Sequence, residues 1–227
     1  MKLNTQFKSL ALLILFAVNA QVLSAQSRAD VFNPNVPLTL LGLDYSQTKY
    51  IGAHENTSVG FSAFTVVRKE DNGLVTDDQF RDEFTVAWNE LFLDEPKKYN
   101  VAKATGRSEV NYALDVTEKA NKTLKKEFFG DDPSVFKTID ESTITSLVKN
   151  YDFGKNKGLG LIFFVEGMSR GLEKEGVWVT FVDMNTKTVL LTKYVTEKPG
   201  GGGFRNYWAK PIFMILKNME SDFKRWQ

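Results

Sequence analysis

The chain has 227 residues with 29 basic and 28 acidic side chains, so its net charge is close to zero. This balance argues against nucleic-acid binding, which usually shows a basic excess, and against a polybasic membrane anchor. The sequence has no cysteine, which excludes disulfides and thiolate metal sites. Its single histidine, His54, lies in a polar stretch typical of an exposed loop. We therefore predict no metal site and no cofactor.

The first 25 residues have the pattern of a secretory signal. Lys2 and Lys8 accompany nine apolar residues at 10–18, and small residues offer cleavage after Ala20 or Ala25. A run of nine is about half of the roughly 20 residues that a membrane-spanning helix needs. We expect an exported protein, periplasmic or extracellular, with no integral membrane segment in the mature chain.

The remaining chain is predicted to form one domain. Residues 26–37 contain two prolines and indicate an extended leader, and residues 38–227 form a single α/β domain. Eighteen phenylalanines and four tryptophans supply a core that is large enough to fold without cross-links.

The first elements of this domain are two strands and a helix. The apolar run Leu38–Asp44 predicts a strand buried on both faces, and residues 59–67 predict a second strand with irregular alternation. Thr76 and Gln79 have the spacing of a capping box. A helix should begin there, present an apolar face and end at Pro96.

The middle of the chain allows two interpretations. Residues 110–116 alternate between apolar and polar side chains, which predicts a strand followed by a helix, although the apolar positions up to Phe128 would also suit one long helix. We prefer the strand. A second capping box, Thr138–Glu141, predicts a further helix that ends before Gly154 and Gly158.

The last third predicts a sheet followed by a helix. Residues 159–168 form a continuous apolar run, and 177–183 and 188–194 form a hairpin around the polar turn 184–187. An apolar stripe predicts a final helix from about Asn206, with Pro211 near its first turn. The expected fold is an α/β (α+β) sandwich: a mixed sheet of about five or six strands, three or four helices, and a C-terminal antiparallel hairpin followed by a long helix.

Three carboxylates are candidates for chemistry. Glu166 lies within an apolar strand, where it must be paired or protonated unless the strand ends there. Asp44 and Asp183 end strands, where ligands often bind, although Asp also initiates turns, and for Asp183 the turn is favoured. If they converged in a cleft, the three could supply the acid and base of a hydrolase.

A glycine-rich segment before the last helix is the strongest binding candidate. Its glycines precede a helix N-terminus that offers free N–H donors, and its arginine could clamp an anion. The predicted ligand-binding residues are Gly202, Gly203, Arg205, Asn206, Tyr207 and Trp208. The alternative is a connection that places Trp208 in the core and pairs Arg205 with an acid.

Several motifs resemble those of a group of uncharacterised exported bacterial proteins. They are Glu166-Gly-Met, Val177-Trp-Val-Thr-Phe-Val-Asp-Met184, Thr188-Val-Leu-Leu191 and Gly203-Phe-Arg-Asn-Tyr-Trp208. The hairpin followed by a long helix also resembles small α/β domains of envelope-assembly proteins, such as TolB amino-terminal domains. This resemblance implies no activity.

Together these observations predict an exported, non-enzymatic binding or assembly factor of the cell envelope. Its expected partner is an envelope protein or a small anionic ligand, bound around Arg205. One alternative is a carboxylate-dependent hydrolase. Another is a structural adaptor that pairs with a partner through a sheet edge.

Overall fold

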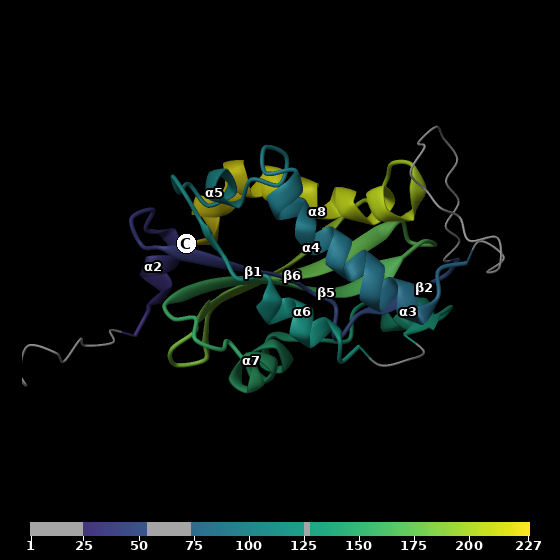
Figure 1. Ribbon diagram of the computed structural model, residues 1–227, viewed down its shortest axis with the longest axis horizontal. Coiled ribbons are helices and arrows are strands. Elements are labelled where there is room, and N and C mark those ends of the chain that lie inside the picture. The colour runs from purple at the N-terminus through teal and green to yellow at the C-terminus, as the bar shows by residue number, and fades with distance from the viewer. Residues whose placement is uncertain (1–24, 54–73, 125–127) are drawn as a thin grey trace, which may run out of the picture.

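The computed structural model describes residues 25–53, 74–124 and 128–227 (Figure 1). It is a mixed α/β fold, as the sequence predicted. The signal segment, His54 and the strand predicted at 59–67 lie outside the described residues.

One sheet contains all seven strands of the described chain. The strands are β1 (Leu38–Asp44), β2 (Lys49–Ile51), β3 (Asn111–Tyr112), β4 (Phe129–Gly130), β5 (Leu159–Ser169), β6 (Lys174–Asp183) and β7 (Thr188–Glu197). β1 and β2 lie end to end along one side of β5 and run parallel to it. On the other side, β6 is antiparallel to β5, and β7 is antiparallel to β6 at the edge. The short strands β3 and β4 add to β1 and β2.

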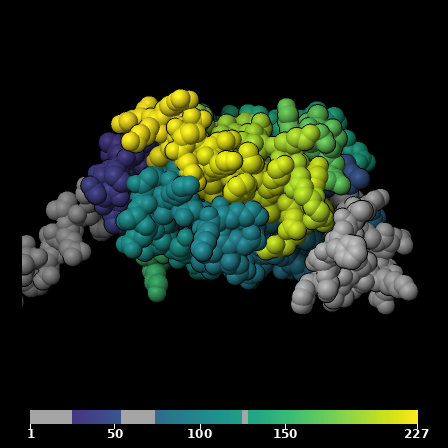
Figure 2. All heavy atoms as spheres, turned by 90° about the horizontal axis from the view of Figure 1, so that it is seen from above, coloured from purple at the N-terminus to yellow at the C-terminus, as the bar shows by residue number. Residues whose placement is uncertain are grey.

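The helices cover both faces of this sheet. They are α2 (Arg28–Phe32), α3 (Asp77–Gln79), α4 (Thr85–Asp94), α5 (Val101–Ala104), α6 (Asp115–Asn121), α7 (Glu141–Asn150) and α8 (Gly203–Asp222), with 3₁₀ turns η2 (Pro133–Phe136) and η3 (Phe223–Trp226). Figure 1 shows α4, α5 and α8 on one side of the sheet and α6 and α7 on the other. In Figure 2, α8 lies across the upper face beside the segment that contains α4 and α5. Among the described residues, none of the helices combines the length and the apolar character that crossing a membrane requires.

Two apolar clusters form the core, one on each face of the sheet. Under α4 and α8, the larger cluster includes Trp88, Phe163 and Trp208. The smaller cluster packs α7 against β5 and β6 through residues such as Ile144 and Ile162. Because β5 and β6 have helices on both faces, their side chains are almost all buried. By contrast, β7 is only partly buried along its length.

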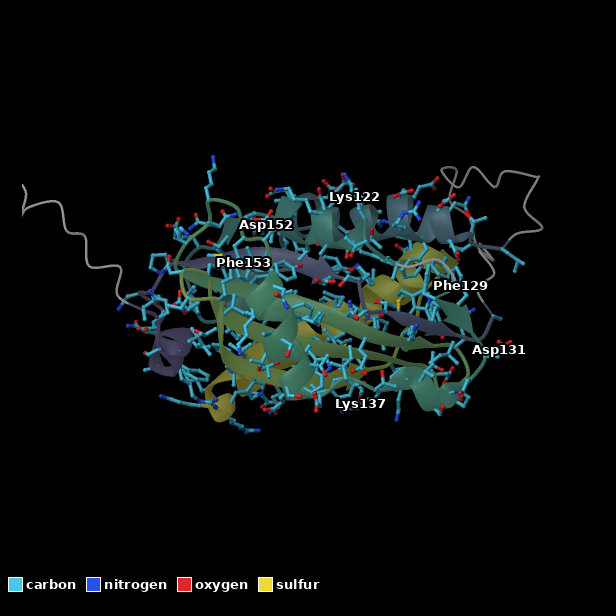
Figure 3. The ribbon with its side chains drawn as sticks, turned by 90° about the horizontal axis from the view of Figure 1, so that it is seen from below. Lys122, Phe129, Asp131, Lys137, Asp152 and Phe153 are labelled. Carbon is cyan, nitrogen blue, oxygen red and sulfur yellow. The ribbon has the colours of Figure 1, made fainter. Side chains whose placement is uncertain are left out.

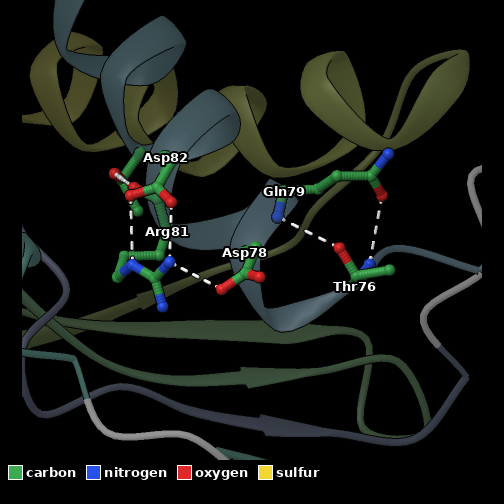
Figure 4. A network of polar contacts seen from close by, with 6 residues as sticks. Thr76, Asp78, Gln79, Arg81 and Asp82 are labelled. Atoms are coloured by element: carbon green, nitrogen blue, oxygen red, sulfur yellow. Dashed lines mark hydrogen bonds and ion pairs between the residues drawn. The ribbon is translucent and has the colours of Figure 1, made fainter.

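The capping box predicted at Thr76 is confirmed. The Thr76 hydroxyl accepts from the Gln79 N–H, and the Gln79 side chain accepts from the Thr76 N–H, both at 3.1 Å (Figure 4). Arg81 binds Asp78 and Asp82 on the next turn. The helix then passes through one π turn, Phe80–Phe84, before α4. These contacts fix the start of the helix that packs Trp88 into the core.

Two helices begin at positions that the sequence did not predict. Residues 26–37 were expected to be extended, but they contain α2, because the Asp30 carboxylate accepts from the N–H and the hydroxyl of Ser27 and Val31 is buried. The helix predicted from Thr138 begins at Glu141, where the Asp140 carboxylate caps the Thr143 N–H at 2.8 Å.

The start of the last helix also differs. α8 begins at Gly203 and not near Asn206, so Pro211 lies inside the helix and not in its first turn. Proline has no N–H to donate to the carbonyl four residues earlier. In its place the Gly200 N–H donates to the Tyr207 carbonyl at 3.0 Å, which explains how the helix tolerates Pro211.

The element counts were also too low. The described residues hold seven strands and seven α-helical segments, against the predicted five or six strands and three or four helices. The additional elements are short: β3 and β4 have two residues each, and α3 and α5 have three and four. Segments of this length are too short to show hydrophobic periodicity.

Candidate functional site

The glycine segment forms the turn that leads from β7 into α8. Gly201 and Gly203 have φ angles of +113° and +74°, a region that favours glycine. Gly200 folds back onto the Tyr207 carbonyl, as described above. These glycines are therefore explained by the turn itself.

The other predicted ligand-binding residues make contacts within the protein. Trp208 is 1% exposed and packs edge-on against Tyr50, with ring centroids 5.4 Å apart. The Arg170 guanidinium lies 4.0 Å from the centroid of the Tyr207 ring. The Arg205 side chain is 37% exposed, and its Nη1 lies 3.9 Å from Glu95 Oε1. Gly202 and Asn206 are exposed. This arrangement resembles the alternative in which Trp208 is in the core and Arg205 lies beside an acid.

The Glu166 side chain is buried, and both of its carboxylate oxygens accept hydrogen bonds from the protein. One carboxylate oxygen accepts from the Thr138 and Ile139 backbone N–H groups, and the other accepts from Trp178 Nε1 at 2.8 Å. The carboxylate thereby ties the segment before α7 to the sheet. Figure 3 shows this face of the sheet. Lys137, the residue before Thr138, lies between Phe153 toward one end and Asp131 at the other.

Asp44 lies on the same face of the sheet and is also buried. It accepts from the Tyr151 hydroxyl and from the Ser46 N–H, both at 2.7 Å. Burial raises the pKa of the Asp44 carboxyl, although these hydrogen bonds act in the opposite direction. Asp44 and Glu166 are each 1% exposed, so a substrate has no access to either.

Asp183 lies at the other end of β5 from Glu166. It pairs with Leu159, seven residues along β5 from Glu166, which corresponds to about 23 Å of strand. Its Oδ1 accepts from the Asn185 N–H at 2.8 Å, which is the turn role that the sequence favoured. Asp183 therefore does not converge with the other two. Asp44 lies opposite Phe164, two residues from Glu166, but both of these carboxylates are buried and accept hydrogen bonds from the protein, so they do not form an accessible acid and base pair.

The edge strand β7 is the most unusual surface feature. Nine of its ten residues pair with β6 on one side, and Leu190 lies at an irregularity in the register. On its other side, no hydrogen bond to the backbone is found among the described residues. An unpaired edge of this length is a template for another strand, and proteins usually shorten, cover or charge such edges.

Two hollows lie along this open edge. The first has a volume of about 520 Å³ and is walled by α7 through Glu141 and Thr145 and by η3 through Trp226. Its floor is the segment Val189–Lys193. The second, about 280 Å³, lies between Lys193–Glu197 and the C-terminal half of α8. Lys193 and Trp226 line both hollows, so the two are neighbours along β7; we call them together the β7 groove.

Charges are ordered along the β7 groove. At the first hollow, Arg28, Lys193 and Arg225 face a single acid, Glu141. The second hollow has two acids, Glu197 and Asp222, with Lys193 at the junction. Asp222 Oδ1 lies 3.0 Å from Arg225 Nη1, so one ion pair connects the two hollows and leaves Glu197 as the acid of the second hollow that has no ion pair among the described residues. The Lys193 ammonium lies 4.8 Å from the centroid of the Trp226 ring, so this ring forms part of the wall at the junction.

None of the ligand-binding residues predicted from the sequence lies in the β7 groove. The strand was predicted at 188–194, but its pattern does not show that one side of it is open. The walls come from segments far away in sequence, such as Arg28, Thr145 and Trp226, and their convergence is set by the fold.

Among the described residues, no group of three or more acidic or histidine side chains could hold a metal ion. Comparison with protein-family models, with curated proteins and with solved structures found no match to this chain. The function therefore has to be argued from the geometry.

Proposed function

We propose that the protein is an exported, non-enzymatic binding or assembly factor of the cell envelope that binds an extended segment of a partner protein in the β7 groove. The observation that carries this proposal is the open edge of the ten-residue strand β7, which has a hollow between α7 and η3 at one end and a hollow beside α8 at the other. In strand addition, backbone hydrogen bonds supply affinity and side pockets supply specificity. This develops the adaptor alternative of the sequence analysis.

The charge order supports a polypeptide over a small anion. Because Arg225 and Asp222 pair with each other, a bound segment would place acidic side chains near Arg28 and basic ones near Glu197. An antiparallel pair is slightly more stable than a parallel one. The bound segment would then carry its basic residues in its amino-terminal half and its acidic residues in its carboxyl-terminal half.

The test uses a ten-residue peptide of alternating threonine and valine, capped at both ends, with two lysines at its amino-terminal end and two aspartates at its carboxyl-terminal end. We call it the Lys-first peptide. Binding is followed by the NMR shifts of the β7 backbone amides in ¹⁵N-labelled protein. Two further versions of the peptide are N-methylated at every second residue, one at the odd positions and one at the even positions. Only alternate N–H groups face β7, so one version should fail to bind and the other should bind as the unmodified peptide does. Equal binding of the two versions would contradict strand addition, as would absence of binding by the unmodified peptide.

A matched pair of variants tests the location. Thr145 and Ser146 are neighbours on α7, and each hydroxyl donates to the carbonyl four residues earlier, but only Thr145 lines the β7 groove. Thr145→Trp should fill the groove and weaken binding at least about tenfold, which is 1.4 kcal/mol. Ser146→Trp should bind as the parent does. Equal binding by all three proteins would place the site elsewhere.

A second copy of this chain could occupy the same edge. Sedimentation analysis over a range of concentrations separates the two cases. We expect a monomer. If the parent were a dimer and Thr145→Trp a monomer, a second copy of the chain would occupy the β7 groove, which would contradict the proposal.

Export and the envelope setting rest on the sequence. The first 25 residues support them, and so does the resemblance to uncharacterised exported proteins and TolB-like domains. A small anionic ligand at Gly202–Trp208 is the second candidate, supported by the partly exposed Arg205 side chain.

A further inference from the structure

Asp183 is a buried carboxylate without a cationic partner. It is 0% exposed, and among the described residues no lysine or arginine lies within ion-pair distance of it. Its acceptor atoms bind three backbone N–H groups, from Asn185, Thr186 and Gln26. A hydrogen bond from a charged donor is stronger than one from a neutral amide. A positive charge on one of these donors would therefore strengthen the contact.

One of the three donors can become a cation. The backbone nitrogen of Gln26 lies 2.9 Å from Asp183 Oδ2, and Gln26 directly follows Ala25, one of the two small residues at which the signal could be cleaved. We infer that the signal is removed after Ala25 and that the new amino terminus of Gln26 forms an ion pair with Asp183.

The step is a hydrolysis by a signal-processing peptidase. Water adds to the carbonyl carbon of Ala25, the bond to the Gln26 nitrogen breaks, and the products are an Ala25 carboxylate and a Gln26 ammonium. Cleavage after Ala20 would leave five further residues attached, and the Gln26 nitrogen would remain a neutral amide.

This contact also bears on the β7 groove. Arg28, two residues after Gln26, lines the first hollow and donates to the Trp226 carbonyl at 2.8 Å. Anchoring the new amino terminus on Asp183 would hold α2 in place at that end of the groove. The inference rests on the predicted export and is independent of peptide binding.

The first experiment expresses the full-length chain in a bacterium and measures the intact mass of the exported protein. We expect a chain that begins at Gln26. A chain that begins at Gln21, or one that keeps the whole signal, would overturn the inference.

The second experiment tests the ion pair with a double-mutant cycle. One chain begins at Gln26 and the other retains Ala25, and each is made with Asp183 and with Asp183→Asn. The extra residue should lower the melting temperature by a few degrees with Asp183 present and have much less effect in Asp183→Asn. An equal effect in both backgrounds would contradict the pair.

A matched control is Asp152→Asn. Asp152 also caps a turn, by accepting from the Gly154 N–H at 2.9 Å, but it is exposed and it does not bind the Gln26 nitrogen. In the Asp152→Asn background, the extra residue should lower the melting temperature by as much as it does in the parent. If Asp183→Asn does not fold, the exported mass still decides the cleavage site.

Discussion

The two outer sides of the sheet differ in how their backbone groups are satisfied. On the β1 side, β3 pairs with the start of β1 and β4 pairs with β2. Between these short strands, side chains from two helices replace a strand. Asn89 Oδ1 accepts from the Leu43 N–H at 2.7 Å, and Asn121 Oδ1 accepts from the Tyr45 N–H at 2.6 Å. Thr117 donates to the Leu41 carbonyl at 2.7 Å.

On the β7 side, the described residues show no such substitute. The closed side shows that this fold can cover an edge with buried amides and hydroxyls, so an open side is not forced by the topology. Its hollows and ordered charges are the features that a strand-binding surface needs. One edge is therefore closed by the protein's own side chains, and the other is the edge at which we propose that a partner binds.

The largest effect should come from opening the closed edge. Asn89→Ala removes the acceptor of the buried Leu43 N–H and a donor to the Leu43 carbonyl. An unsatisfied buried group costs roughly 1–3 kcal/mol, so we expect a loss of about 3 kcal/mol in urea unfolding. The exposed Asn150→Ala on α7 is the control and should change stability by less than about 0.5 kcal/mol. A loss below about 1 kcal/mol in Asn89→Ala would mean that this edge does not depend on the amide.

The next effect concerns Glu175 on β6, the strand that supports the open edge. Glu175 is 0% exposed, and neither carboxyl oxygen has a hydrogen-bond partner among the described residues. Burial raises its pKa well above the ordinary value of 4.5. The folded state therefore keeps a proton that the unfolded state loses.

The sign for stability follows from this shift. The stabilisation that the protonated Glu175 gives to the folded state is fully present below about pH 4.5. As the pH rises toward the pKa of the folded state, the free energy of unfolding falls by about 1.4 kcal/mol per pH unit. Glu175→Gln should make the free energy of unfolding decline less steeply between pH 5 and 8. Part of the decline should remain, because the pKa of Asp44 is also raised and gives a slope of the same sign. The exposed Glu90→Gln should leave the decline unchanged, and an unchanged decline in Glu175→Gln would show that the carboxyl is not protonated in the fold.

A smaller effect tests the charge order of the open edge. The parent should bind the Lys-first peptide about fivefold more tightly than a peptide of the same composition with the charged ends exchanged, since a surface ion pair contributes up to about 1 kcal/mol. Arg225→Glu should remove this preference. Lys224→Glu, on the same turn but outside the groove lining, should keep it. Equal binding of both peptides would reject the charge order and leave strand addition standing, and tighter binding of the exchanged peptide would indicate a parallel segment.

The sequence could predict the long, periodic elements and not the contacts between them. The run at 159–168 and the hairpin turn at 184–187 carry local signals, and β5, β6 and β7 extend a few residues beyond them. The acceptors of the Leu43 and Tyr45 N–H groups are Asn89 and Asn121, which are distant in sequence and which no local pattern marks as buried. Edge position is a property of the assembled sheet, so the pattern of β7 could not reveal it.

The smallest expected effect separates the open edge from the start of α8 as the binding surface. The Arg205 carbonyl accepts from Trp88 Nε1 at 2.9 Å, a contact that Arg205→Ala retains. The side chain loses only a partly exposed ion pair with Glu95, so unfolding should change by less than about 0.5 kcal/mol and the Lys-first peptide should bind as before. Glu95→Gln removes the same pair and keeps the arginine, so the two variants should behave alike. If Arg205→Ala alone abolished binding while keeping the parent's stability, the α8 start would be the binding surface and the open edge would not.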